Sequence, residues 1–520
     1  MQNKLLIICF LLSWKTLSAQ KETRRLVINA KSGPVQGILT DGCVKFMGIP
    51  YATPPTGPLR WQAPQPVRPW AKVRDASKPC SPCPQLPVAY ANTASENEDC
   101  LYLNITAPAS KTGSTRRPVM VWLHGDGAVG SGDLFDPSEL VRSGNVIVVT
   151  INYRLSVFGG FGYPGLVYSG TFGLLDQQEA LRWIKTNIAA FGGDPGNVTL
   201  FGVSYGALSA GLQLLSPTAK GLFHKVILQS GFMLMDLPAG AVFPGIEAMD
   251  WFGLRETREV KEIGAQIGKQ LCSESIASLR KRPVKDLLPF LQVFQSYAFG
   301  NSVVPTNPES ALRRGAFNHI PVLAGNTGDE HRTFVGLFRV LAKRPVTAAQ
   351  YPVLLDSAFG KKARQVEKQY PLTKFKTPAL ALATVFTDYM WAKSTFRQHQ
   401  LFSHLEPVYA YEFHDRNAPT ELPFPKDMPP GAYHNADVDY LFPTRTFQAK
   451  LTARQQALSK KMITYWTQFA WKGKPASPAE WKAFDRKDQV PFVLSLAPDR
   501  IGPIDYEQVH QLHFWQKLTT

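Results

Sequence analysis

Strongly apolar runs that alternate with helical patterns constrain the fold of this chain most. Residues 119–123 and 146–151 are continuous apolar or β-branched runs, which are typical of strands covered on both faces. Residues 176–190 carry apolar side chains at helical spacing and end at two glycines. The series continues with strand-like runs at 198–201, 226–228, 321–324 and 408–413, and with a last helix at 457–471. This alternation predicts an α/β fold, with helices on both faces of a central, twisted, mostly parallel sheet.

The first 19 residues predict a signal peptide. Lys4 precedes the apolar run Leu5–Leu12, and Ser18-Ala19 offers small residues for cleavage. The run is too short to span a bilayer of roughly 30 Å, although it could instead remain attached as an anchor or a buried first strand. No later stretch predicts a transmembrane anchor. We therefore expect a secreted or periplasmic protein whose residues 20–520 form a single domain, because no repeat or long linker divides them.

The charge of the chain is strongly basic but dispersed. The net charge is +17, from 57 Lys and Arg against 40 Asp and Glu. Nucleic-acid binding requires basic residues that cluster on one face or arm, whereas here only short runs such as 280–282 stand out. We expect a basic, solvated surface and no nucleic-acid partner.

The sharpest local motif is Gly202-Val203-Ser204-Tyr205-Gly206, a G-x-S-x-G between a predicted strand and a predicted helix. In that context the motif predicts a tight turn that presents a nucleophilic serine. The flanking glycines avoid clashes in the turn, and the helix N-terminus favours a developing negative charge. The alternative is a serine that caps an ordinary helix.

A serine hydroxyl needs a base, and the base needs an orienting acid. With this type of turn, the chain order is nucleophile, acid, histidine. His434 follows the last predicted strand of the central series and is late enough to be the base, although a surface histidine is the alternative. Between them, the turn after residues 321–324 offers Asp329 and Glu330, and chemistry alone leaves both open.

The attack of a serine on a carbonyl produces an oxyanion, which backbone N–H groups stabilise. These donors are predicted in the segment His124-Gly125-Asp126-Gly127, directly after the strand at 119–123. It is similar to a loop whose backbone N–H groups bind an oxyanion, and the residue after the nucleophile adds a further N–H. A plain glycine-rich turn is the alternative. No spacing of Cys and His suggests a metal site, and no cofactor is implied.

Beyond these motifs, the chain resembles the type-B carboxylesterase and cholinesterase family of the α/β-hydrolases. The resemblance runs nearly from end to end, through segments that follow one another in order. They are FMGIPYA (46–52), PPTGPLRW (54–61), EDCLYLN (98–104), NYRL (152–155), GLLDQQ (173–178), NIAAFGGDP (187–195), LQSG (228–231), YWTQFA (465–470) and HFW (513–515).

The resemblance implies the α/β-hydrolase fold and the hydrolysis of small-molecule carboxylic esters. It assigns the nucleophile to Ser204, the base to His434 and the orienting acid to Glu330 rather than Asp329. It assigns the oxyanion donors to the backbone N–H groups of Asp126, Gly127 and Tyr205.

The resemblance also implies a disulfide. It pairs Cys100 with Cys83, which lies in the family's sequence context, with Cys80 as the rival; the closed loop of roughly 17 residues contributes about 3 kcal/mol. The family's second disulfide is absent, so Cys272 has no evident partner. With the predicted signal removed, five of the six cysteines remain, so at least one is unpaired or linked to another chain.

Several positions depart from the family's pattern. Val203 and Tyr205 stand where the elbow has Glu and Ala, Asp126 and Ala128 stand where the loop has Gly and an aromatic residue, and His331 replaces a Gly after the acid. A carboxylate about 5 Å from an oxyanion costs roughly 3 kcal/mol at an effective dielectric near 20. We therefore expect the Asp126 side chain to point away, to be neutralised, or to meet a cationic substrate group.

Two alternative functions fit the same fold. A lipase needs a lid, and the segment between Cys83 and Cys100 is short and polar, which argues against a large one. That segment also lacks the tryptophan that cholinesterases use, so choline esters are not expected. A non-catalytic adhesion protein would have lost the nucleophile, although the altered oxyanion loop keeps this alternative open. The oligomeric state is not indicated.

Overall fold

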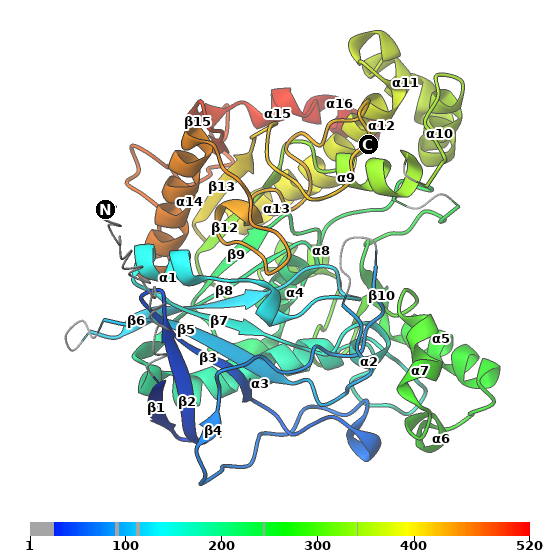
Figure 1. The fold of residues 1–520 in the computed structure, drawn as a ribbon. Helices are drawn as coiled ribbons and strands as arrows, with labels where there is room; N and C mark the ends of the chain where they lie inside the picture. The colour runs from blue at the N-terminus through cyan, green and yellow to red at the C-terminus, as the bar shows by residue number, and fades with distance from the viewer. Residues whose placement is uncertain (1–24, 89–92, 111–114, 243–244, 341, 520) are drawn as a thin grey trace, which may run out of the picture.

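The chain folds around one large twisted sheet, seen in a computed structural model that describes residues 25–88, 93–110, 115–242, 245–340 and 342–519 (Figure 1). The predicted signal peptide at residues 1–19 lies outside the described residues. Within them, the 13-stranded sheet has the order β1-β2-β3-β5-β7-β6-β8-β9-β12-β13-β14-β15, and β4 pairs with β2. The strands are β1 (Arg25–Ala30), β2 (Gly33–Thr40), β3 (Cys43–Pro50), β4 (Arg74–Asp75), β5 (Tyr102–Pro108), β6 (Arg117–Leu123), β7 (Ile147–Ile151), β8 (Gly193–Val203), β9 (Lys225–Gln229), β12 (Val322–Thr327), β13 (Val408–Phe413), β14 (Val493–Leu496) and β15 (Ile501–Ile504).

The centre of this sheet is parallel, as the alternation of strands and helices predicts. From β7 through β6, β8, β9, β12 and β13 to β14, every neighbouring pair is parallel. Antiparallel pairs stand at both ends, from β1 to β7 on one side and between β14 and β15 on the other. The predicted α/β-hydrolase architecture with a mostly parallel sheet is therefore confirmed.

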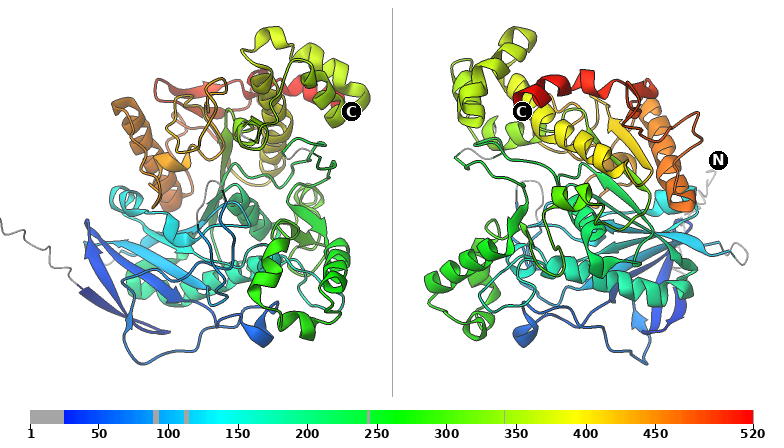
Figure 2. Two further views of the ribbon diagram at one scale, coloured as in Figure 1. Left: turned by 45° about the vertical axis from the view of Figure 1, so that its right-hand side comes forward. Right: turned by 180° about the vertical axis from the view of Figure 1, so that it is seen from behind.

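Helices cover both faces of the sheet, and two further groups of helices extend from it (Figure 2). Helices α5, α6 and α7 lie together at one edge, and α10 and α11 lie at another (Figure 1). The helices are α1 (Ser138–Gly144), α2 (Ser156–Gly159), α3 (Phe172–Asn187), α4 (Tyr205–Leu215), α5 (Thr257–Gln270), α6 (Ile276–Arg280), α7 (Val284–Leu287), α8 (Pro308–Arg313), α9 (Arg332–Val335), α10 (Gln350–Phe359), α11 (Ala363–Gln369), α12 (Pro378–Phe386), the π-helix η9 (Thr387–Ala392), α13 (Lys393–Phe402), α14 (Ala453–Lys472), α15 (Tyr506–Val509) and α16 (Leu512–Thr519). A separate parallel pair, β10 (Leu254–Glu256) and β11 (Tyr297–Phe299), flanks the α5–α7 group.

Strand β6 shows why both faces of the sheet are covered. Its side chains Val119, Val121 and Leu123 belong to one hydrophobic cluster, and Met120 and Trp122 belong to another. Because successive side chains of a strand point to opposite faces, these clusters lie on opposite sides of the sheet. Helices α3 and α4 pack into the first cluster, and α1 and α14 pack into the second.

Helix α14 is longer than its apolar pattern predicts. It begins one turn before residue 457, because Thr452 caps it and its side chain accepts the Gln455 N–H, while the Gln455 side chain binds back to the cap. It ends at Gly473, which takes the left-handed conformation with φ 72°. The extra turn is polar, so it carries no apolar periodicity.

Candidate active site

Ser204 occupies a sharp turn between the end of β8 and the start of α4. Its backbone has φ 55° and ψ −121°, a region that costs a non-glycine residue about 1–3 kcal/mol. The flanking glycines allow the close approach: a Cβ added at Gly206 would lie 2.1 Å from the Leu123 carbonyl oxygen, and one at Gly202 would lie 2.7 Å from the same oxygen. The turn therefore depends on both glycines of the G-x-S-x-G motif, and it leaves the Ser204 side chain partly exposed.

Two other side chains meet this serine from distant parts of the chain. The Ser204 hydroxyl lies 2.8 Å from His434 Nε2, although the two residues are 230 positions apart. On the other side of the ring, His434 Nδ1 lies 2.5 Å from Glu330 Oε2. Glu330 is fully buried in the turn after β12, and its second oxygen accepts the Thr327 N–H at 2.9 Å. The structure thus brings together the hydroxyl, the imidazole and the carboxylate that the sequence predicted.

Asp329, the other candidate acid, points into a different set of contacts. Its carboxylate pairs with Arg332 at 2.7 Å and with Arg416 at 3.5 Å, and it accepts the Ala432 N–H at 3.0 Å. The last contact ties the turn after β12 to the loop that carries His434. Asp329 is therefore placed to hold that loop, and it does not contact the imidazole.

Aromatic rings enclose the His434 imidazole. The ring of Trp391, from η9, lies 4.7 Å from it, and the ring of Phe334, from α9, lies 5.2 Å from it, measured between centroids. The Trp391 indole N–H donates to His331 Nδ1 at 3.2 Å, and His331 Nε2 faces the Ala241 carbonyl oxygen at 3.0 Å. Burial lowers the pKa of His331 to about 3, so this ring is neutral and donates from Nε2.

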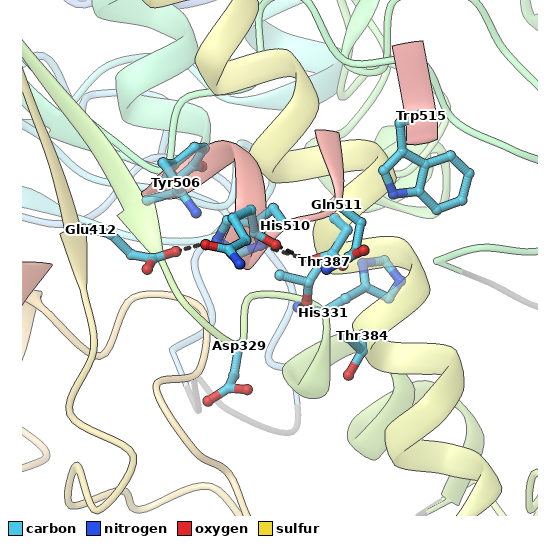
Figure 3. A network of polar contacts seen from close by, with 12 residues as sticks. Asp329, His331, Thr384, Thr387, Glu412, Tyr506, His510, Gln511 and Trp515 are labelled. Atoms are coloured by element: carbon cyan, nitrogen blue, oxygen red, sulfur yellow. Dashed lines mark hydrogen bonds and ion pairs between the residues drawn. The ribbon is translucent and has the colours of Figure 1, made fainter. Parts of the chain in front are cut away.

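These surrounding rings were not predicted from the sequence. His331 stood out only as a departure from the family's pattern, and no motif marked Trp391 or Phe334. The rings come from separate helical elements, and no spacing along the chain connects them to His434. Figure 3 shows the side chains of Asp329 and His331 directed to different sides of the turn after β12.

The predicted oxyanion loop lies beside the serine with an unusual backbone. Asp126 has φ 77° and Gly127 has φ 82°. The Asp126 carboxylate oxygen Oδ1 accepts the N–H groups of Ala128 at 3.0 Å and Val129 at 3.1 Å. The charged side chain is thus bound by its own loop, and two backbone dipoles offset part of its charge.

Tyr205, whose N–H is the remaining predicted donor, supports the loop. It is the first residue of α4, so its N–H has no carbonyl partner one turn earlier in the helix. Its buried ring packs against Gly127, where an added Cβ would lie 2.7 Å from the ring, and its centroid lies 4.9 Å from that of Tyr297. The ring that replaces the family's small residue therefore fills the space beneath the loop.

The predicted disulfide is confirmed as Cys83–Cys100, with a sequence separation of 17. Cys80, the rival, is a free thiol, as are Cys43 and Cys272. Among the described helices, none is long and apolar enough to cross a membrane. Within the described part of the chain, no three His, Cys, Asp or Glu side chains gather as a metal site would require.

Comparisons with known proteins agree over almost the whole chain. The model of the carboxylesterase family matches residues 24–515. The para-nitrobenzyl esterase of Bacillus subtilis (strain 168) is 32% identical over 485 residues, which are 90% of this chain and 94% of that protein. The cocaine esterase of Oryctolagus cuniculus is 30% identical over 541 residues, covering 94% of each. A solved structure of a PNB esterase superposes with a TM-score of 0.75 at 31% identity, covering 95% of this chain and 99% of that one.

Proposed function

Because this chain belongs to the carboxylesterase family and is a carboxylic-ester hydrolase, we propose that it cleaves small-molecule esters through an acyl-enzyme on Ser204. The observation that carries this proposal is the continuous line of contacts from the Ser204 hydroxyl through His434 to Glu330, at 2.8 and 2.5 Å. Both distances are within the reach that proton transfer and ring orientation require.

In the first step, His434 Nε2 takes the hydroxyl proton while Ser204 Oγ attacks the ester carbonyl carbon. The carbonyl electron pair moves to the oxygen, and the N–H groups of Asp126, Gly127 and Tyr205 stabilise the oxyanion. When the tetrahedral intermediate collapses, the C–O bond to the alcohol breaks and His434 gives its proton to the leaving oxygen. The acyl group remains on Ser204.

In the second step, water replaces the alcohol and the same groups act in reverse. His434 takes a proton from water, the hydroxide attacks the acyl carbon, and Ser204 leaves with the proton returned by His434. Glu330 accepts the Nδ1–H throughout, so the lone pair stays on Nε2 and the imidazolium is stabilised when it forms. The Glu330 carboxylate keeps its orientation because it is buried and because its other oxygen accepts the Thr327 N–H.

The substrate class we propose is small esters of aryl or benzyl type. The names of two relatives, a para-nitrobenzyl esterase and a cocaine esterase, support this class. The aromatic rings of Trp391 and Phe334 beside His434 are compatible with it, because aromatic groups pack favourably against such rings.

We further propose that the chain is exported, to the periplasm or the medium. The Cys83–Cys100 disulfide supports this, since disulfides persist in oxidising compartments and are rare in the cytosol. Cell fractionation followed by intact mass measurement tests it, and we expect a mature chain that begins near Gln20. A full-length chain in the cytoplasm with both thiols reduced would contradict it.

The mechanism is tested by labelling the purified enzyme with a fluorophosphonate and mapping the modified peptide. We expect one adduct, on Ser204, with loss of esterase activity in proportion to labelling, and no adduct in S204A. A non-catalytic adhesion protein gives no adduct. A lipase gives the same adduct but turns over emulsified long-chain triacylglycerols faster than dissolved short-chain esters, which would overturn the proposed substrate class.

A further inference from the structure

We propose that Gln295 is a positioning residue for the oxyanion hole, one that aims the Gly127 N–H by holding the carbonyl of the same peptide unit. This inference rests on the proposed function and adds to it a residue on a distant segment. Gln295 lies just before β11, and neither the motifs nor the family resemblance single it out.

The side-chain amide of Gln295 contacts the loop at two oxygens. Its Nε2 donates to the main-chain carbonyl of Asp126 at 3.0 Å, and it lies 3.5 Å from Asp126 Oδ1. Both oxygens only accept, so the amide must present its NH₂ group rather than its oxygen. Because the two Asp126 oxygens can only accept, Gln295 is the donor in both contacts.

A planar trans peptide makes this contact relevant to catalysis. In such a unit the carbonyl of one residue and the N–H of the next point in opposite directions within one plane. The carbonyl held by Gln295 belongs to Asp126, and the N–H across the same unit belongs to Gly127. Fixing the oxygen on the Gln295 side therefore directs the Gly127 N–H to the other side, where the proposed mechanism needs it.

The backbone conformations of the two flanking residues leave this peptide unit able to rotate, so the contact from Gln295 adds to the bonds that the Asp126 side chain makes within the loop. Asp126 has φ 77°, a value that is uncommon for a non-glycine residue. Gly127, with φ 82°, can take many other conformations at little cost. A flip of the unit would turn a carbonyl oxygen toward the developing oxyanion in place of a donor.

Gln295 itself sits on a well-anchored segment. The Leu291 carbonyl accepts the Ser156 hydroxyl, and the Phe294 ring lies 5.1 Å from that of Phe161. Tyr297, two residues further on, packs its ring 4.9 Å from that of Tyr205, next to the nucleophile. The segment 291–297 therefore braces the site at two points, through Gln295 and through Tyr297.

The next peptide of the loop is held in a related way. The Ser156 N–H, at the start of α2, donates to the Gly127 carbonyl at 3.0 Å. On the preceding unit, His124 Nδ1 lies 3.0 Å from the Gly125 carbonyl, and burial lowers the pKa of His124 to about 4, so a neutral ring donates there. Gln295 is thus the side chain that holds the central one of three consecutive carbonyls.

The test compares three variants with the wild type on p-nitrophenyl acetate. Q295L removes the donor at similar volume, and Q295E keeps the shape of the side chain but cannot donate when ionised. Q292L is the matched control, because Gln292 is exposed on the same segment. We expect kcat to fall about 10- to 100-fold in Q295L and Q295E with KM nearly unchanged, since loss of a whole oxyanion donor costs about 100- to 1000-fold. We expect Q292L to match the wild type.

Two further readouts separate positioning from a loss of structure. The inhibition constant of a trifluoromethyl ketone, which forms an oxyanion on the serine, should rise by the same factor as kcat falls. The ratio of Q295E to wild-type turnover should rise as the pH falls, because the carboxyl group introduced by that substitution regains an O–H donor when it is protonated. If Q295L does not fold, Q295M takes its place, because it also lacks a donor and adds no charge beside the Asp126 carboxylate.

The outcomes distinguish this inference from the proposed function. A wild-type enzyme that forms no Ser204 adduct overturns the proposed function and this inference with it. A wild type that is labelled and active, with Q295L or Q295E as active as Q292L, overturns the inference alone.

Discussion

Asp126 places a carboxylate in the loop that, in the proposed mechanism, stabilises a negative charge. A carboxylate about 5 Å from an oxyanion, at an effective dielectric near 20, raises the energy of that oxyanion by roughly 3 kcal/mol. The N–H groups of Ala128 and Val129 bind Oδ1 and offset part of that cost, and the same two bonds hold the loop in shape. In the proposed mechanism the charge of this side chain opposes catalysis and its hydrogen bonds assist it, and a substitution can separate the two effects.

Asp126→Asn should raise kcat/KM on a simple chromogenic ester by about 10-fold. The amide keeps an oxygen for the two loop N–H groups and removes the charge, and a gain of about 1.4 kcal/mol corresponds to that factor. Asp126→Gly also removes the charge but gives up both loop bonds, so we expect a smaller gain. Steady-state kinetics at low and high salt measure both, and a slower Asp126→Asn would show that the charge assists binding or chemistry.

The three side chains that meet at the candidate site could be predicted from the sequence, whereas the residues that surround and support them could not. Ser204 and His434 follow from a turn motif and from chain order, and the resemblance selects Glu330 from two neighbouring acids. Gln295 and Trp391 carry no such signal, because their roles arise only when the fold brings distant segments together. The local sequence does not show which atom a glutamine amide or a tryptophan indole will contact in the folded chain.

At the scale of elements, a buried ionic cluster fixes the C-terminal helices to the sheet. His510, at the end of α15, lies with Nε2 2.5 Å from Glu412 of β13 (Figure 3). Its Nδ1 lies 2.7 Å from Asp388 of η9. Burial raises the pKa of Asp388, but when both carboxylates are ionised their oxygens only accept, so both ring nitrogens carry protons. Burial opposes this charge, but the carboxylates of Glu412 and Asp388 outweigh it and raise the pKa of His510 to about 10.

The stability of the protein should therefore fall as the pH rises from about 6.5 toward 10. The pKa of a histidine in the unfolded chain is about 6.5. The ion pairs of His510 therefore contribute their full free energy of stabilisation below pH 6.5, and this contribution is lost as the pH rises toward the folded pKa of about 10 and His510 deprotonates. Chemical unfolding at several pH values measures this loss of stability.

His510→Gln should flatten the pH dependence of stability and lower the free energy of unfolding by about 3–5 kcal/mol, because two buried carboxylates lose their cation. His513→Gln is the control, since His513 is exposed, and an equal effect of both variants would contradict the assignment.

The Cys83–Cys100 disulfide should contribute about 3 kcal/mol to stability, since it closes a 17-residue loop that leads into β5. Replacing both cysteines with serine should lower the free energy of unfolding by that amount in denaturant titrations. Cys80→Ser should have little effect, because that thiol is free. A larger loss from Cys80→Ser than from the double variant would contradict the pairing.

Helices and strands could be predicted from the sequence where the burial of their side chains produces a regular apolar pattern. The run at 198–201 predicts a strand, but β8 runs from Gly193 to Val203, because pairing of Gly193 with Arg117 of β6 extends it through residues with low strand propensity. The helix predicted at 176–190 begins four residues earlier, as α3, since its first turn is buried on all sides and shows no periodicity.

At the scale of the whole molecule, one sheet contains strands from both ends of the described chain. β1 begins at Arg25, and β15 ends at Ile504. Ser204, Glu330 and His434 follow β8, β12 and β13, three strands from the parallel centre of that sheet. We therefore propose that residues 20–520 form a single domain in which the site and the sheet are stable only together.

Thermal unfolding followed by calorimetry should show one transition, and activity should be lost across the same temperatures. A chain truncated before Val493 should not fold, because it lacks β14 and β15 and exposes the edge of β13. Two separate transitions, or a folded and active truncated chain, would contradict a single domain.

The central claim, an acyl-enzyme on Ser204 formed with His434 as base, is tested most directly by rapid quenching. The wild type is mixed with p-nitrophenyl acetate, stopped in acid within milliseconds, and examined by intact mass and peptide mapping, with His434→Ala and S204A alongside. We predict one acetyl group on Ser204 of the wild type, formed much more slowly in His434→Ala and absent from S204A. Continued turnover by S204A, or an acetyl group on another residue that forms and decays at the rate of turnover, would contradict the account.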